Sequence, residues 1–168
     1  ANDGLWEWDL STGEVYYSRR WKEMLGLDPE TPLTSIEGWF ERIHDEDCEA
    51  VQKAMDAYLE THYDRIDLEY RIRHENGEYI WASARGLASY DHEGNLLRIA
   101  GSQTDITERK QQEEALKHAA FHDVLTGLSN RALLLDRLSH VIDRVKRVGE
   151  KSAAVLFIDL DRFKFVND

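Results

Sequence analysis

Two carboxylates follow an apolar stretch in the run FIDLDRFKFVND, residues 157–168. Asp159 and Asp161 are two residues apart, so on a strand both side chains would point to the same side. Carboxylate oxygens suit Mg²⁺, which takes one or two protein carboxylates and completes its shell with phosphate oxygens and water. The next residues begin like a helix, whose free N–H groups favour phosphate. The pattern is compatible with the start of a metal and phosphate site and also with ordinary surface charges.

The elements before this run predict the opening of an α/β domain. Residues 125–131 read as a turn with a helix cap at Ser129 or Asn130, and residues 153–158, AAVLFI, are continuously apolar, as in a central strand that is covered on both faces. Such a strand needs neighbours, and no candidate follows it. We therefore expect this second domain to be present only as its opening helix and first core strand. The inner face of the helix is predicted to carry Leu134, Leu138, Val141, Ile142 and Val145.

A polar helix is predicted between this domain and the rest of the chain. Residues 108–124 contain no Gly or Pro and are rich in helix formers. The helix face with heptad-like spacing is only half apolar and spans about two heptads, too few for an independent coiled coil. Two interpretations stay open, a solvated linker helix and a parallel dimer helix that flanking domains support. The residues on this face are Ile106, Lys110, Glu113, Leu116 and Ala120.

The first part of the chain predicts an α+β domain of residues 1–107. Residues 5–18 alternate around an STG turn, which predicts a hairpin, and Ser18 can cap a short helix. Thr34 has capping-box spacing to Glu37, and Asp45 is a candidate cap for a longer helix.

From Asp67 onward the apolar period changes to two. Turn sequences at residues 75–78 and 91–95 divide this region into three extended runs, because Asn-Gly and Gly-Asn pairs tolerate positive φ. Together with the hairpin they predict a five-stranded antiparallel sheet with helices on one face.

Composition limits the function classes. Residues 1–107 carry 10 Lys and Arg against 23 Asp and Glu, whereas residues 108–168 carry 11 against 10. The acidic first part argues against a nucleic-acid partner, since phosphate binding needs clustered basic residues. The chain has no apolar stretch of membrane-spanning length and no secretion signal at its start, so we expect a cytoplasmic protein. The single cysteine, Cys48, cannot form an internal disulfide.

Residues 4–107 resemble a PAS sensor domain that ends in a PAC motif. The stretches GLWEWDL (4–10), EYRIRHENGEYIW (69–81) and GSQTDITERK (101–110) carry the resemblance. Its most specific part is the closing Asp105, Ile106 and Thr107. The chain departs from the family at Asp45, where a Pro usually follows the His. The resemblance implies a ligand space between helices and sheet, in which the five tryptophans could frame a flavin or haem or form a packed core.

Residues 121–131 and 157–168 are similar to the start of a GGDEF domain, the diguanylate cyclase fold. The resemblance implies that Asp159 and the backbone of Leu160 bind Mg²⁺. It also implies two facing domains that each hold one GTP, so this chain alone is expected to be inactive. The implied GTP contacts are Arg162, Phe163, Lys164 and Asn167.

These resemblances divide the chain into a sensor (1–107), a signalling linker helix (108–124) and the first part of a GGDEF domain (125–168). The resulting hypothesis is a homodimer, paired through the PAS domain and the linker helix, that regulates a diguanylate cyclase. In it a signal alters strand pairing near residues 101–105, and Asp105 and Thr107 join strand to helix.

Two alternatives stay open. One is the sensor of a histidine kinase, with His118 or His122 as phosphate acceptor, and the other is a ligand-binding or dimerisation module with a degenerate output domain. The same two histidines have the i, i+4 spacing of a zinc site, but no third ligand follows them, which favours a surface pair.

Overall fold

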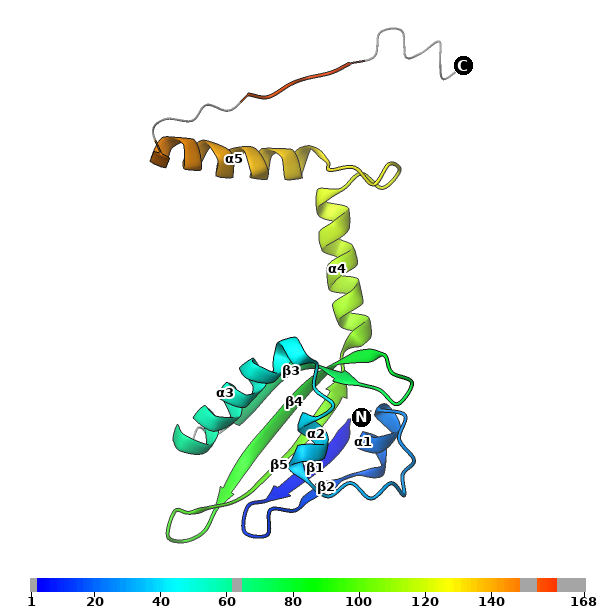
Figure 1. Ribbon diagram of the computed structural model, residues 1–168, viewed down its shortest axis with the longest axis vertical. Helices are drawn as coiled ribbons and strands as arrows, with labels where there is room; N and C mark the ends of the chain where they lie inside the picture. Colours follow the sequence, from blue (N-terminus) through cyan, green and yellow to red (C-terminus); the bar gives the residue numbers. More distant parts are fainter. Residues whose placement is uncertain (1–2, 62–64, 149–153, 160–168) are drawn as a thin grey trace. The chain divides into compact units, whose positions relative to one another are not determined.

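A computed structural model describes residues 3–61, 65–148 and 154–159 of this chain. The chain divides into two compact units, residues 1–113 and 114–168. Its elements (Figure 1) are β1 (Gly4–Asp9), β2 (Val15–Tyr17), α1 (Arg19–Met24), α2 (Ile36–Phe40), α3 (Asp45–Thr61), β3 (Arg65–Arg73), β4 (Tyr79–Tyr90), β5 (Leu96–Asp105), α4 (Thr107–Phe121) and α5 (Arg131–Val148).

The first unit is built on a five-stranded antiparallel sheet, as predicted. The strand order is β2-β1-β5-β4-β3, so β5 lies at the centre between β1 and β4. The predicted hairpin forms between β1 and β2, and the three later runs form the meander β3, β4 and β5. Figure 1 shows α2 in front of the sheet and α3 along its β3 side. The α+β fold class and the PAS topology are therefore confirmed.

One face of the sheet holds the core. Trp21 from α1, Trp39 from α2 and Met55 from α3 pack in one buried cluster with sheet residues such as Tyr70 and Ile99. Alternation along β3 explains this choice of face, because its buried and exposed residues follow each other with period two. The exposed residues of β3 place charged side chains on the opposite face, among them Arg65, Asp67 and Glu69.

Two predicted helix caps are wrong by one residue. Ser35, not Thr34, caps α2, because its hydroxyl accepts a hydrogen bond from the N–H of Gly38 at 3.3 Å. At α3 the preceding residue is the cap. His44 accepts from the N–H of Asp47 through its carbonyl oxygen and from the N–H of Glu46 through its ring nitrogen, and Asp45 is already helical. An unprotonated ring nitrogen of histidine is a hydrogen-bond acceptor, so it can satisfy one of the free N–H groups at the start of a helix.

The helix that leaves the sheet starts two residues after the last residue of β5, with only Ile106 between them, and ends before the predicted point. α4 runs from Thr107 to Phe121, because Asp123 folds back in a turn in which its carboxylate accepts two hydrogen bonds from Thr126. Asn130 then caps α5 by accepting from the N–H of Leu133 at 3.2 Å. The predicted opening helix of the second domain is therefore present.

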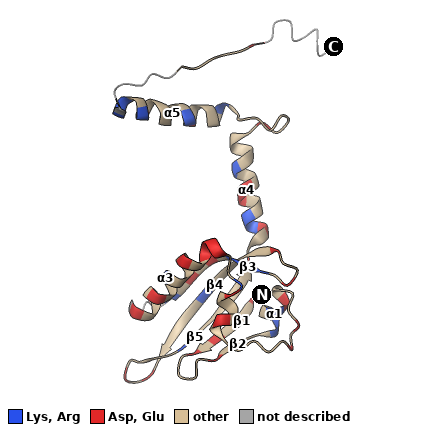
Figure 2. Ribbon diagram, in the orientation of Figure 1, with Lys and Arg blue, Asp and Glu red and all other residues tan. Residues whose placement is uncertain are grey.

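The central strand predicted at residues 153–158 does not form over its described residues, 154–158. Residues 154–159 adopt no helix or strand, and Phe157 and Ile158 are more than four-fifths exposed. A strand needs neighbours for its N–H and C=O groups, and among the described residues no strand pairs with residues 154–158. None of the described helices is long and apolar enough to cross a bilayer. Figure 2 shows acidic residues concentrated on α3, basic residues on α5, and residues of both signs on α4.

Candidate functional site

A small apolar cavity lies inside the first unit, between the sheet and the helices. Its volume is about 30 Å³, close to that of one water molecule. A flavin or haem does not fit into the core as it is packed here, since ligand pockets are roughly ten times larger or more. The lining residues are Trp6, Trp8, Val15, Tyr17, Trp21, Ile36, Trp39, Met55, Ile66, Leu68, Tyr70, Ala84 and Gln103.

A buried series of hydrogen bonds joins three of the residues that line this cavity, Trp39, Tyr70 and Gln103. The Trp39 indole N–H donates to the Tyr70 hydroxyl at 2.8 Å, and the Tyr70 hydroxyl donates to Oε1 of Gln103 at 2.6 Å. The Gln103 amide nitrogen lies 3.9 Å from the sulfur of Met24 in α1. Burial raises the pKa of the Tyr70 hydroxyl, so the hydroxyl stays protonated and able to donate. The series therefore connects α2, β3, β5 and α1 through the core.

Two residues beyond Gln103, strand β5 passes directly into helix α4. The Asp105 carboxylate accepts a hydrogen bond from the N–H of Thr107 at 2.8 Å. The Thr107 hydroxyl oxygen accepts from the N–H of Trp81 at 2.9 Å, and the N–H of Ile106 donates to the carbonyl oxygen of Trp81 at 2.8 Å. Ile106 is buried, at 8% exposure. These bonds fix the first residues of α4 to strand β4, and we call Asp105, Ile106 and Thr107 the joint.

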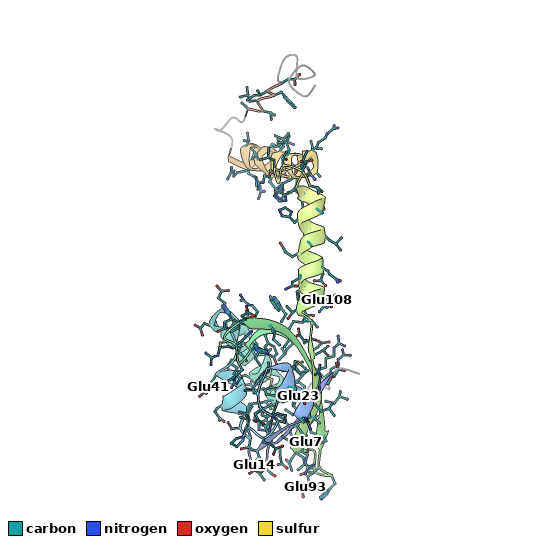
Figure 3. The ribbon with its side chains drawn as sticks, turned by 90° about the vertical axis from the view of Figure 1, so that its right-hand side faces the viewer. Glu7, Glu14, Glu23, Glu41, Glu93 and Glu108 are labelled. Atoms are coloured by element: carbon teal, nitrogen blue, oxygen red, sulfur yellow. The ribbon has the colours of Figure 1, made fainter. Side chains whose placement is uncertain are left out.

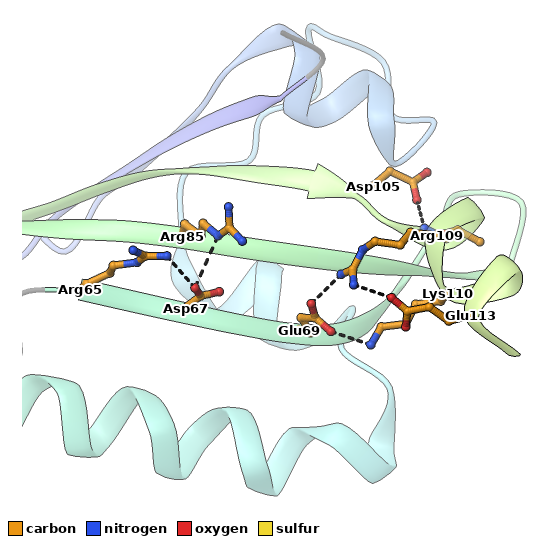
Figure 4. Close-up of polar contacts among 9 residues, drawn as sticks. Arg65, Asp67, Glu69, Arg85, Asp105, Arg109, Lys110 and Glu113 are labelled. Carbon is orange, nitrogen blue, oxygen red and sulfur yellow. Dashed lines mark hydrogen bonds and ion pairs between the residues drawn. The ribbon is translucent and has the colours of Figure 1, made fainter. Parts of the chain in front are cut away.

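A second set of contacts holds the first turn of α4 to the outer face of β3. Glu69 pairs with Arg109 and Lys110, each at 2.6 Å, and Arg109 also pairs with Glu113 at 2.8 Å (Figure 4). The Lys110 ammonium lies 4.9 Å from the centre of the Trp81 ring, within cation–π range. The hydrogen bonds from Lys110 and Arg109 hold the pKa of Glu69 below its ordinary value. We call Glu69, Arg109 and Lys110 the clamp.

The sequence named the three joint residues, and the structure brings them together where strand becomes helix. It did not name Gln103, Tyr70 or Glu69. Gln103 could have been predicted from the sequence, because it is a polar residue at an inward position of an alternating strand. A buried amide of this kind needs a hydrogen-bond partner. The partner of Glu69 lies 40 residues away along the chain, and helix spacing alone cannot reveal such a pair.

The predicted nucleotide and metal residues remain a prediction. Asp159 lies in the exposed segment 154–159, and its carboxylate suits Mg²⁺. Leu160, Arg162, Phe163, Lys164 and Asn167 lie outside the described residues, as does Asp161. In the described part of the chain no three His, Cys, Asp or Glu side chains gather as a metal site would require.

The histidine pair has an arrangement of its own. The His118 and His122 rings stack with their centres 4.1 Å apart, and a ring nitrogen of His122 lies 3.1 Å from the carbonyl oxygen of His118. The pair therefore forms a local contact at the end of α4.

Comparison with known families matches both halves of the chain. The family model for the PAS fold matches residues 14–103, and the model for the diguanylate cyclase GGDEF domain matches residues 120–168. Diguanylate cyclase TpbB from Pseudomonas aeruginosa is 51% identical over 85 residues, which are 49% of this chain and 19% of that protein. The chain thus spans about a fifth of the length of this curated relative.

Two solved structures share the fold of the first unit. A sensory box histidine kinase/response regulator from Burkholderia thailandensis is 35% identical, with a TM-score of 0.62, over 71% of this chain and 88% of that one. The N-terminal domain of a diguanylate cyclase with PAS/PAC sensor from Marinobacter aquaeolei is 25% identical, with a TM-score of 0.59, over 64% of this chain and 98% of that one.

Proposed function

This chain belongs to the PAS fold family, and from that premise we propose that it is the sensor and signalling helix that regulate a diguanylate cyclase. In this proposal the domain matched at residues 120–168 belongs to a complete cyclase that converts two GTP into cyclic di-GMP. A cytoplasmic location, where GTP is available, is part of the proposal.

One observation carries this function. Gln103 lines the core cavity and hydrogen-bonds Tyr70, and two residues later the same strand enters the joint. A change in the cavity that moved Gln103 would therefore act on β5 at a point where α4 is fixed to it. Hydrogen-bond networks with two arrangements are a physical route for such coupling.

The clamp attaches α4 to β3, in addition to the joint that attaches it to β4 and β5, so the orientation of α4 depends on all three strands. Coupling between a ligand and an output needs an element with two states whose balance the ligand changes. We propose that the clamp and the joint together are this element, and that α4 transmits its state to the cyclase through a homodimer formed by the PAS domain and α4.

For the output domain we propose the nucleotide site that its family implies. Asp159 and the backbone of Leu160 would hold Mg²⁺, which when bound would offset the charge of the GTP phosphates. The proposed GTP contacts are Arg162, Phe163, Lys164 and Asn167. Asp159 fits this role by its chemistry, as a hard oxygen ligand.

The test uses the protein with its complete GGDEF domain and measures cyclic di-GMP formed from GTP. We expect Gln103→Leu to change the rate several-fold relative to wild type, because it removes the acceptor of Tyr70 without changing the output domain. Glu60→Leu, at an exposed position of α3 outside both the cavity and the groove lining, is the control and should leave the rate unchanged. Equal rates in all three proteins would reject the coupling, provided that each is folded by circular dichroism.

A second measurement tests the helix. Single cysteines placed along residues 110–120, in a Cys48→Ser background, would be crosslinked in active and inactive forms of that protein. A crosslinking pattern that shifts along α4 between the two forms supports a change of register. Identical patterns would contradict it.

A sensor histidine kinase is the second candidate, because the Burkholderia thailandensis relative carries that description. Its phosphate acceptor would be His118 or His122. Incubation of the complete protein with radiolabelled ATP decides between the two candidates. A histidine kinase would become labelled, and His118→Gln or His122→Gln would abolish the labelling, whereas a cyclase regulator would not become labelled.

A further inference from the structure

A groove of about 480 Å³ opens on the surface of the first unit between α2 and α3. The apolar residues that line it are buried or half-buried, whereas its charged residues are exposed. A volume of this size falls in the range of small-molecule sites. The apolar lining consists of Trp8, Ile36, Phe40, Met55 and Leu59, and the polar lining consists of Glu37, Glu41, Gln52 and Asp56.

All the charge on the groove is negative. Of the described residues that line it, three are carboxylates and none is Lys or Arg. Asp56 is held in place by Gln52, whose amide donates to it at 2.7 Å. Figure 3 labels Glu41, which lies on the outside of the domain beside α2. An anionic ligand would therefore meet three like charges, whereas a cation would meet three of opposite sign.

The lining also offers two aromatic residues to a ligand. Phe40 is held by Trp39, whose ring centre lies 4.7 Å away, and Trp8 forms part of the groove wall. Aromatic faces next to carboxylates are how proteins bind quaternary and protonated amines, because the ring quadrupole attracts a cation while the apolar wall accepts its hydrocarbon part. We infer that this groove binds an organic cation with an apolar body.

The groove shares a wall with the core cavity. Trp8, Ile36 and Met55 line both. Trp8 is also paired in register with Ile99 of β5, the strand that leads to the joint. The Trp8 indole N–H is buried and has no hydrogen-bond partner among the described residues, so a shift of its ring breaks no hydrogen bond of the side chain. The inferred ligand is thus the class of signal for the sensor, and this part of the inference rests on the proposed function.

The test titrates the 168-residue chain, labelled with ¹⁵N, with benzyltrimethylammonium and follows the indole N–H resonances by NMR. A Trp8→Phe variant assigns the Trp8 resonance. We expect this resonance to shift and saturate, and phenylacetate and benzyl alcohol to leave it in place. Raising the salt from about 0.05 M to about 0.5 M should weaken binding, because the three carboxylates are exposed and screened.

Variants separate the carboxylates from general acidity. Glu41→Gln should weaken binding roughly three- to tenfold, since it removes one charge beside the aromatic faces. Glu60→Gln, an exposed carboxylate on α3 outside the groove, should leave the affinity unchanged. An absent or non-saturating shift would overturn the inference, and so would equal binding of benzyl alcohol or an equal effect of Glu60→Gln.

The outcomes also distinguish this inference from the proposed function. Saturable binding with no effect of the probe on cyclic di-GMP synthesis would keep the groove as a cation site and count against the sensor role. Absent binding, with Gln103→Leu still changing the cyclase rate, would reject the cation site and leave the sensor role in place.

Discussion

The hydroxyl oxygen of Thr107 accepts a hydrogen bond from the N–H of Trp81 at 2.9 Å, so the first residue of α4 is bonded to the neighbouring strand β4. The N–H of Thr107 itself bonds to Asp105. In a continued strand, a backbone carbonyl of β5 would accept the hydrogen bond from the Trp81 N–H. Here the Thr107 hydroxyl oxygen accepts it, while the backbone of Thr107 already begins helix α4. This allows the chain to pass from sheet to helix without leaving the Trp81 N–H unsatisfied.

Thr107→Val keeps the shape of the side chain and removes the acceptor. We expect a loss of about 1 to 3 kcal/mol in the free energy of unfolding, the usual cost of an unpaired, partly buried N–H. Urea denaturation followed by tryptophan fluorescence measures it. Thr12→Val, in an exposed turn where the hydroxyl makes only a 3.3 Å contact, is the control and should cost much less. Equal losses in the two variants would mean that the joint bond contributes no special stability.

Tyr70→Phe tests the buried series of hydrogen bonds. Removing the hydroxyl leaves both the Trp39 indole N–H and the Gln103 amide oxygen without this partner inside an apolar core. We expect a loss of about 1 to 3 kcal/mol for each group left unsatisfied. Chemical denaturation gives the value, and Tyr16→Phe, with Tyr16 at 63% exposure, is the matched control that should change stability little. A Tyr70→Phe protein as stable as wild type would show that the two groups find other partners.

The sheet was predictable because its information is local. Period-two alternation along β3 and turn sequences at residues 75–78 and 91–95 define strands that the structure reproduces. The exact helix caps were not predictable from the sequence. Thr34 and Ser35 have equally suitable side chains, and only the path of the backbone decides which of them caps α2. Long-range requirements were also hidden. A Cβ on Gly101 would lie 2.0 Å from the carbonyl oxygen of Arg85, and no local pattern announces this close approach.

The central strand predicted at residues 153–158 shows the opposite failure, since its described residues 154–158 form no strand. Its apolar run has the composition of a buried strand, but composition supplies no hydrogen-bond partners. The joint could be named because its three residues are contiguous and lie within the stretch GSQTDITERK, which carries the PAS resemblance. The clamp could not be named, since Glu69 and Lys110 meet only after β3, β4 and β5 have paired.

Glu69→Gln tests the clamp by removing its carboxylate. Because the Glu69 side chain is 38% exposed, its ion pairs should each contribute only the modest energy of surface pairs. We expect the amides of residues 110–113, the first with acceptors in the helix, to exchange with solvent roughly two- to fivefold faster, since the first turn of α4 loses its attachment to β3. Glu108→Gln, in the same turn, should leave this exchange unchanged, because its carboxylate contacts Gln112 within the helix. If the amides exchanged equally fast in both variants, the loss of any carboxylate near the N-terminus of α4, and not the loss of the clamp, would explain the faster exchange.

Asp47 predicts how the stability of the first unit depends on pH. Its carboxylate accepts three hydrogen bonds from Arg71, from the backbone N–H at 2.8 Å and from the guanidinium at 2.9 and 2.7 Å. The guanidinium bonds are the main cause that holds the pKa of Asp47 below its ordinary value of 3.8. A carboxyl whose folded pKa is lowered stabilises the fold above its unfolded pKa, and this contribution disappears as the pH falls through the folded pKa.

Asp47→Asn should therefore cost stability near neutral pH, by about 1.5 to 3 kcal/mol for charge-assisted hydrogen bonds, and should cost little at low pH. Urea denaturation at several pH values, from neutral to below the folded pKa, measures both. Asp45→Asn is the matched control, because Asp45 shares the first turn of α3 but does not contact Arg71 among the described hydrogen bonds. If the two variants lost the same stability with the same dependence on pH, the helix dipole rather than the Arg71 pair would be the cause.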